Sequence, residues 1–270
     1  MSLPLWLVEL IKKAFRYRFL AAKLTKAPLL GRIIDHILFE NDDIIYVPQD
    51  EVIQLNMTIE RMEEMVLPSS VVEHFIQKAK HHWVMNWCIC RASEKCKDYP
   101  IDLGCLFLGE ASMKINSRLG HPVTKEEALK HIRRCQKAGL VNLIGRNNLD
   151  AVWLAVGPGY KLLTICNCCP CCCLWRILPY LAPNIRSRIT KMPGVEVTVN
   201  DRCNGCGTCM EEVCFIKAIR LVDNHAVIGE ECLGCGRCVN MCPQKAIEIK
   251  IDREQFVVSI ERISSSVDVS

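Results

Sequence analysis

The feature that most constrains this chain is a cysteine pattern that occurs twice between residues 203 and 242. The first copy reads Cys203-x2-Cys206-x2-Cys209-x4-Cys214, and the second reads Cys232-x2-Cys235-x2-Cys238-x3-Cys242-Pro243. Each copy lies between two short β-type segments, which predicts a duplicated strand–helix–strand unit of about 28 residues. The four predicted strands are Val195–Val199, Ala218–Val222, His225–Ile228 and Ala246–Ile251.

The spacing within each copy suits a cluster of iron and sulfide. Three thiolates at two-residue intervals on a tight loop can reach three neighbouring corners of a cubane, and glycines such as Gly205 and Gly234 let the backbone wrap it closely. In two-cluster proteins with this motif the fourth cysteine serves the other cluster. We therefore predict two [4Fe-4S] clusters with exchanged fourth ligands, one on Cys203, Cys206, Cys209 and Cys242, the other on Cys232, Cys235, Cys238 and Cys214.

Residues 195–252 resemble a bacterial-type two-[4Fe-4S] ferredoxin domain in these motifs. The resemblance implies a ferredoxin-like fold and a low-potential one-electron carrier. The first copy departs from the family pattern, because four residues separate Cys209 from Cys214 and Phe215 replaces the usual proline. Zinc in the same eight cysteines is the weaker alternative, because structural zinc prefers paired C-x2-C knuckles.

Cysteine accounts for 19 of the 270 residues, and ten of the remaining cysteines form two groups. Six cysteines within eight residues cannot all belong to a core, since consecutive side chains point in different directions. We therefore predict one or two further iron–sulfur clusters, or zinc, with ligands drawn from both groups. The candidate ligands are Cys88, Cys90, Cys96 and Cys105 in the first group, and Cys166, Cys168, Cys169, Cys171, Cys172 and Cys173 in the second.

The Cys-x-Cys-Arg sequence at residues 88–91 and the cysteine run at residues 166–173 also carry a resemblance. They are similar to the cysteine-rich region ahead of the ferredoxin module in [4Fe-4S] dicluster-domain proteins of anaerobic archaea and bacteria. This resemblance covers most of the chain and implies iron–sulfur chemistry without naming a substrate. The lone Cys135 is expected to be a small buried hydrophobic residue.

The predicted fold class is α+β, with a mostly helical cysteine-rich domain followed by the ferredoxin-like duplicated βαβ domain. Capping boxes predict one helix from Ser70 to about Trp87, delivering Cys88, and another from Lys125 to about Ala138. A short helix is expected over residues 58–65. Residues 140–144 and 151–156 indicate a β-hairpin, so that helix and hairpin together form a winged-helix-like pattern.

Proline positions and charge patterns divide the chain into five segments. We expect a basic amphipathic helical region over residues 1–47, a cysteine-rich α+β domain over 48–174, a linker over 175–194, the two-cluster domain over 195–252 and a tail over 253–270.

The distribution of charged and apolar residues along the chain indicates which kinds of binding partner to expect. Residues 1–32 carry seven basic side chains and one acidic one. Their amphipathic helix is expected either to contact an anionic membrane surface or an acidic partner, or to pack on its own domain. Residues 196–252 carry nine acidic and six basic side chains, a face suited to a redox partner. The pI of about 8.2 lies below that typical of a nucleic-acid-binding domain, so no nucleic acid is expected.

No segment approaches the roughly 20 apolar residues of a membrane-spanning helix, and the N-terminus lacks the order of a signal peptide. We therefore expect a cytoplasmic protein with reduced thiols, at most peripheral on the inner membrane face.

These features predict an iron–sulfur electron-transfer protein that feeds an anaerobic oxidoreductase as a carrier or subunit, with a redox protein or oxidoreductase complex as its partner. No catalytic residue is assigned. One alternative is an enzyme with an open-site cluster at Cys166–Cys173 acting on a thiol or disulfide. The other is a redox-sensing regulator that uses the winged-helix-like segment.

Overall fold

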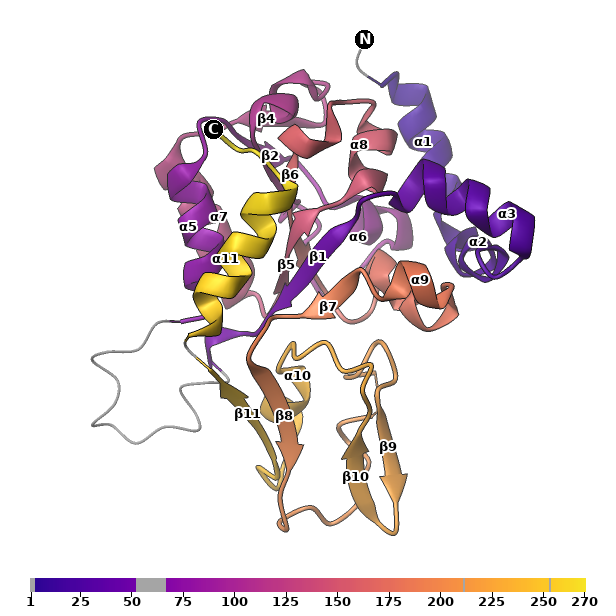
Figure 1. The fold of residues 1–270 in the computed structure, drawn as a ribbon, viewed down its shortest axis with the longest axis vertical. Coiled ribbons are helices and arrows are strands. Elements are labelled where there is room, and N and C mark those ends of the chain that lie inside the picture. Colours follow the sequence, from indigo (N-terminus) through magenta and orange to yellow (C-terminus); the bar gives the residue numbers. More distant parts are fainter. Residues whose placement is uncertain (1–2, 52–66, 211, 253) are drawn as a thin grey trace.

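The larger part of the molecule is built on a seven-stranded sheet with the strand order β4-β2-β3-β6-β5-β1-β7 (Figure 1). The computed structural model describes residues 3–51, 67–210, 212–252 and 254–270. Adjacent strands are antiparallel except β1 and β7, which are parallel. The strands are β1 (Asp43–Val47), β2 (His82–Met85), β3 (Leu106–Leu108), β4 (Gly120–Pro122), β5 (Val141–Arg146), β6 (Leu163–Cys168) and β7 (Ile189–Lys191).

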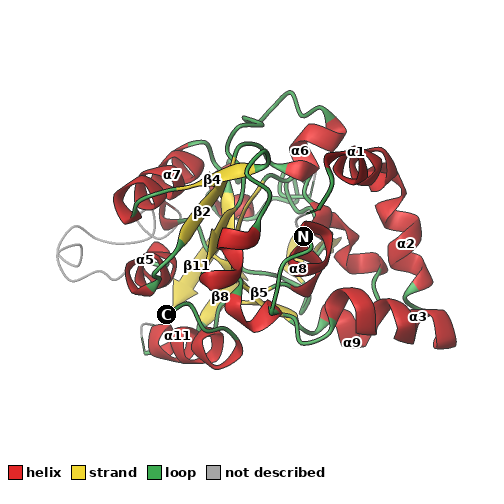
Figure 2. Cartoon of the chain, turned by 90° about the horizontal axis from the view of Figure 1, so that it is seen from above, coloured by secondary structure: helices red, strands yellow, loops and turns green. Residues whose placement is uncertain are grey.

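Helices cover both faces of this sheet, as seen from above in Figure 2. On β1, Ile45 and Val47 pack toward one face while Tyr46 packs toward the other, the alternation expected of a strand buried on both sides. One face carries α5 (Ser69–Lys78), α7 (Lys125–Lys137) and α11 (Gln255–Ser266). Toward the other lie α1 (Leu5–Ala14), α2 (Arg18–Leu24), α3 (Pro28–Ile34), α6 (Ile89–Glu94) and α8 (Asn148–Leu154).

Shorter helical segments connect these elements. They are η1 (Phe15–Tyr17), η2 (Asp35–Phe39), η4 (Glu110–Lys114), η5 (Gly159–Lys161), η6 (Leu174–Tyr180) and α9 (Pro183–Arg186). Within the described part of the chain, no helix is both long enough and apolar enough to cross a bilayer.

Residues 195–252 form the smaller part, at the bottom of Figure 1. The four predicted strands are present as β8 (Val195–Val199), β9 (Ile219–Val222), β10 (His225–Ile228) and β11 (Ile247–Ile251). β8 pairs with β11 and β9 with β10, both antiparallel. The predicted duplicated βαβ pattern holds only in part, because of the two halves only the second has a helix, α10 (Arg237–Met241), among the described residues. Turns follow the first cysteine triplet instead.

The cysteine-rich domain is α+β, as predicted, but its centre is the seven-stranded sheet rather than helices. The helix predicted from Ser70 to Trp87 ends at Lys78, and β2 follows and leads to Cys88. Ser70 does not cap this helix, which begins at Ser69, and the Ser69 N–H donates to Asp50 Oδ1 at 3.0 Å. The Thr124 capping box is confirmed, with both of its hydrogen bonds present. The helix predicted over residues 58–65 lies outside the described residues.

The predicted hairpin is also wrong, because β5 pairs with β6 and residues 151–156 lie largely in α8. Asp150 explains the difference: its carboxylate accepts hydrogen bonds from Asn147 Nδ2 at 2.6 Å, Trp153 Nε1 at 2.7 Å and Thr164 Oγ1 at 3.0 Å. These contacts hold the first turn of α8 against β6. The winged-helix-like pattern is therefore absent here, and the regulator alternative loses its basis.

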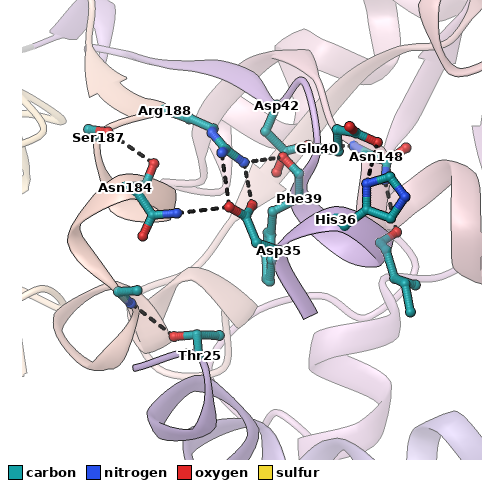
Figure 3. A network of polar contacts seen from close by, with 12 residues as sticks. Thr25, Asp35, His36, Phe39, Glu40, Asp42, Asn148, Asn184, Ser187 and Arg188 are labelled. Carbon is teal, nitrogen blue, oxygen red and sulfur yellow. Dashed lines mark hydrogen bonds and ion pairs between the residues drawn. The ribbon is translucent and has the colours of Figure 1, made fainter. Parts of the chain in front are cut away.

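The segments expected to be a linker and a tail are structured parts of the larger domain. Residues 175–194 contain η6, α9 and β7, which extends the sheet beside β1. Figure 3 shows the Asp35 carboxylate accepting hydrogen bonds from Arg188 and from Asn184 Nδ2, the latter at 2.8 Å, which ties the N-terminal helices to this segment. Residues 254–270 contain α11, which returns from the smaller part to the sheet.

Candidate metal centres

The first ferredoxin-type cysteine group gathers side chains from both motif copies. Cys203, Cys206, Cys209 and Cys242 line one small cavity at the end of β9, β10 and β11. Burial raises the pKa of Cys209, and the neighbouring Cys242, Cys203 and Cys206 thiols add to the shift. The predicted fourth cysteine thus lies beside the three of the other copy.

The second group has the reciprocal arrangement. Burial raises the pKa of Cys232 to about 11, and the Cys235 and Cys214 thiols add to it. The pKa of Cys238 is raised for the same reasons, with Cys235, Cys232 and Cys214 as its nearest thiol neighbours. Such thiols lose their protons when a metal binds, so a metal rather than solvent would keep them ionised.

Backbone geometry around the two groups follows the internal repeat. Ala218 N donates to Cys214 Sγ at 3.2 Å, and Ala246 N donates to Cys242 Sγ at 3.3 Å. Gly205 and Gly234 occupy matching places with φ of +72° and +62°. A Cβ atom on Gly234 would lie 2.6 Å from Val195 Cγ1, so the loop can wrap this closely only with glycine.

The two groups differ in their surroundings. Cys206 of the first group is exposed. The second group packs against the hydrophobic cluster that contains Phe215, Leu233 and Tyr46 of β1. The first group therefore reaches the surface at Cys206, whereas the second lies beside the larger domain.

The ten other candidate cysteines come together on loops at the sheet. Cys88 and Cys90 flank the start of α6, Cys105 precedes β3, and Cys166 lies on β6. β3 pairs with β6, so Cys105 Sγ lies 3.7 Å from Cys166 Sγ although 61 residues separate them. The ten divide into two groups by position.

The four-thiol site consists of Cys96, Cys169, Cys171 and Cys172. Their Sγ atoms all lie within 4.8 Å of one another. The Cys96–Cys171 distance is 3.6 Å and the Cys171–Cys172 distance is 3.5 Å.

The other six of the ten cysteines line one cavity, the six-thiol cavity. It has a volume of about 520 Å³, and its walls include apolar side chains such as Leu7 and Ile11 of α1 and the rings of Trp87, Trp153 and Trp175. Its cysteines are Cys88, Cys90, Cys105, Cys166, Cys168 and Cys173, with Cys169 of the four-thiol site at the edge.

Two buried guanidinium groups lie next to these thiols. Arg91 is completely buried, donates from Nη1 to Asn167 O at 2.7 Å and also donates to Leu103 O. Arg237 donates to Cys168 O. Neither forms an ion pair with a described carboxylate, and both Nε atoms are buried without a partner.

A buried cation requires a nearby negative charge. Burial alone would lower the pKa of Arg91, yet the Cys88, Cys169 and other nearby thiols raise it overall. The pKa of Cys88 is lowered to about 7, mainly by a hydrogen bond from Cys90 and also by the positive charge of Arg91, which together outweigh burial. Thiolates of a metal centre supply the missing negative charge, so the six-thiol cavity fits an anionic cluster.

Tyr46 connects the six-thiol cavity to the second ferredoxin-type group. Its ring lies 5.7 Å from that of Phe215, and its Oη is buried with no hydrogen-bond partner among the described residues. Burial raises its pKa, and the Cys173, Cys168 and Cys235 thiols add to the rise. Tyr46 therefore has cysteines of both centres as neighbours.

Arg91, Arg237 and Tyr46 are not among the site residues predicted from the sequence. Arg91 follows Cys90 directly and Arg237 lies inside the second triplet, so their positions in the motifs were available signals. Nothing in the sequence marked Tyr46. Cys135 is buried in α7 as predicted, and burial raises its pKa to about 12.

Comparison with known proteins gives one match. Residues 210–252 match the family model of the LdpA Fe-S cluster-binding domain, a range that contains Cys214, Cys232, Cys235, Cys238 and Cys242. No curated protein and no solved structure matches the chain. The match and the cysteine groups together support the class of iron–sulfur protein.

Proposed function

We propose that this protein is an iron–sulfur electron carrier. Two [4Fe-4S] clusters in residues 195–252 exchange electrons with a third iron–sulfur centre in the six-thiol cavity. The main support for the proposal is the position of Tyr46 and Arg237 between the two groups. Tyr46 has Cys173 and Cys168 of the cavity and Cys235 of the second ferredoxin-type group as neighbours. Arg237 belongs to the second ferredoxin-type motif and donates to Cys168 O of the cavity. Cysteines of both groups also belong to one hydrophobic cluster, so the two proposed centres are neighbours within the protein.

The ligands follow from the two groups described above. Cys203, Cys206, Cys209 and Cys242 hold the outer cluster, and Cys214, Cys232, Cys235 and Cys238 hold the inner one. The clusters supply one-electron redox chemistry when bound. The chain holds them with N–H groups aimed at sulfur and excludes water from the inner one with Phe215 and Leu233.

The outer cluster is the proposed entry point for a redox protein or oxidoreductase complex. Cys206 is exposed there, and the surrounding residues 196–252 carry three more acidic than basic side chains. A partner with a basic docking face matches this surface, and its association should weaken as salt increases.

Oxygen-free purification of the full chain tests the proposal. We expect about eight irons per chain from residues 195–252 and further iron from the six-thiol cavity. Cys206→Ala should lose iron from the outer cluster and slow reduction of an acceptor protein, whereas Cys135→Ala, a buried cysteine outside all sites, should keep both. A well-folded but colourless and iron-poor protein would overturn the proposal.

The cavity favours a second candidate function, reduction of an apolar disulfide. Six thiols exceed the four ligands of a cubane, and about 520 Å³ lies within the roughly 300–1,000 Å³ of small-molecule sites. The reaction takes two electrons from the clusters and two protons and yields two thiols. Leu7→Trp would fill the cavity, so it should abolish turnover of an apolar aryl disulfide without changing the iron content. Turnover that is absent, or unaffected by this variant, excludes the enzyme function.

A further inference from the structure

We propose that the four-thiol site holds a single zinc ion and not an iron–sulfur cluster. Four thiolates around one tetrahedral ion with Zn–S bonds of about 2.3 Å lie about 3.8 Å apart. The Sγ–Sγ separations of 3.5 Å and 3.6 Å match this arrangement, and all four Sγ atoms lie within 4.8 Å of one another. A cubane spreads its thiolates over four iron corners, which places them farther apart.

The ferredoxin-type cysteines provide an internal comparison. Among the eight cysteines of residues 203–242, no group of ligand atoms is as compact as the four-thiol site. The chain therefore contains two kinds of thiol arrangement. The ferredoxin-type cysteines are more widely spaced, whereas the four-thiol site is compact enough for a single metal ion. Four thiolate ligands without an open position are typical of structural zinc.

Hydrogen bonds to sulfur provide a second observation. Among the four thiols, Cys169 Sγ accepts a backbone hydrogen bond from Cys172 N at 3.4 Å. Four thiolates on Zn²⁺ leave a net charge of two minus. The positive charge of Arg91, for which Cys169 is a neighbour, offsets part of it.

The position of the site indicates what the ion does. Cys96 follows α6, whereas the other three cysteines follow β6, so one ion joins two loops 73 residues apart in sequence. Cys168 and Cys173 of the six-thiol cavity flank the three ligands on the second loop. Zinc has no redox chemistry, so it holds these loops in place without joining the electron path.

Metal analysis of the full chain, produced with iron and zinc both supplied, tests the proposal. We expect one zinc per chain, lost in both Cys96→Ala and Cys171→Ala, with most iron retained in each. Cys135→Ala is the matched control, because this cysteine packs against the same site but is not a ligand, and it should keep its zinc.

Two outcomes would overturn the zinc site: loss of iron instead of zinc from Cys96→Ala, or zinc retained in both ligand variants. Failure of the electron-carrier proposal looks different, because iron would then be missing while zinc remained. Two ligand variants are used so that misfolding of one does not decide the result.

A separate observation concerns the surface of α1, η1, α2, α3 and η2. This segment has nine large apolar side chains that are exposed, almost half of all those exposed in the described chain, and Trp6 and Leu29 are 69% and 75% exposed. The nine are Trp6, Leu10, Tyr17, Leu20, Leu24, Leu29, Leu30, Ile33 and Ile37. Exposed cations lie among them, namely Lys13, Arg16, Lys23, Lys26 and Arg32.

We infer that this helical face docks on an anionic lipid bilayer. Apolar side chains that protrude from short helices can enter the interface, while lysine and arginine ends reach the phosphate groups. The charge complementarity selects anionic over neutral lipid, since each cation near such a surface contributes to binding. Residues 196–252, the segment with net negative charge, lie in the smaller part of the molecule, away from α1, α2 and α3 (Figure 1).

Co-sedimentation with vesicles of phosphatidylglycerol and phosphatidylcholine tests the inference. We expect binding that falls at least about tenfold on pure phosphatidylcholine and in high salt. Leu20→Glu with Leu29→Glu should abolish it, whereas Val257→Glu, an equally exposed apolar site on α11, should not. Equal binding to both vesicles, no binding, or a dimer that the double variant dissociates would overturn the inference.

Discussion

Arg91 is the residue on which the two N-terminal thiol groups converge. Its guanidinium is completely buried, donates to the carbonyls of Asn167 and Leu103, and has thiols of both the six-thiol cavity and the four-thiol site as charged neighbours. A cation in this position is stable only when the surrounding sulfur atoms carry negative charge.

Arg91→Met is therefore expected to destabilise the protein by about 3 kcal/mol. The substitution leaves two buried carbonyls without their hydrogen-bond donor and removes the positive charge that balances the thiolates. Urea unfolding measures this, and iron content should fall as well. Arg133→Met on exposed α7 is the control and should change stability by less than about 0.5 kcal/mol. Equal effects of the two variants would contradict the role of Arg91.

Asp42 makes stability depend on pH. Asp42 Oδ1 accepts from Asn148 N at 2.6 Å, Oδ2 is buried without a partner, and burial raises the pKa of this carboxyl from 3.8 to about 8. The folded state thus keeps a proton that the unfolded state releases. The resulting stabilisation is complete below the unfolded pKa and is lost as pH rises toward about 8.

Asp42→Asn should consequently flatten the decline in stability between about pH 5 and pH 8. Urea midpoints at both pH values measure the slope. Asp102→Asn, an exposed carboxylate beside Arg134, should leave the slope as it is in the parent chain. An unchanged slope in Asp42→Asn would show that Asp42 does not cause the decline.

Individual elements differ in how far local sequence accounts for them. α7 starts at Thr124 with both hydrogen bonds of a capping box, whereas α5 starts at Ser69 without one, although Ser70 and Glu73 have the same spacing. Position in the structure, not the motif alone, decides which serine or threonine caps a helix.

Thr124→Ala should cost about 1 kcal/mol of unfolding free energy, since it leaves an N–H of the first turn without its acceptor. Ser70→Ala should cost much less, because Ser70 already lies inside α5. Thermal unfolding of the two variants provides the comparison. A similar loss in both would indicate that propensity, not capping, controls these helices.

At the level of the whole molecule, α11 joins the two parts of the chain. It follows β11 of the smaller part and packs on β1 and β5 of the large sheet, where Ile263 is fully buried. Arg262 forms an ion pair with Asp43 of β1 and donates to Thr190 Oγ1 of β7 at 2.9 Å. The chain therefore returns to the larger domain after completing the ferredoxin-type part.

Ile263→Ala should destabilise the protein by about 3 kcal/mol through the cavity it leaves. Val257→Ala on the exposed side of α11 is the control and should have little effect. Urea unfolding followed by both tryptophan fluorescence and cluster absorbance measures the change. Loss of cluster absorbance at the parent midpoint in Ile263→Ala would show that α11 does not couple the two parts.

Features that depend on short spacing could be predicted from the amino-acid sequence. The four strands of residues 195–252, the α7 capping box and the proximity of Cys242 to Cys203, Cys206 and Cys209 all follow from motifs whose geometry is set within a few residues or by an internal repeat. The remaining features depend on long-range packing and become visible in the folded chain. The seven-stranded sheet pairs strands far apart in sequence, and that pairing sets the division of ten cysteines into a four-thiol and a six-thiol group. Strand register is a long-range property, because it depends on which apolar faces find each other when the chain collapses.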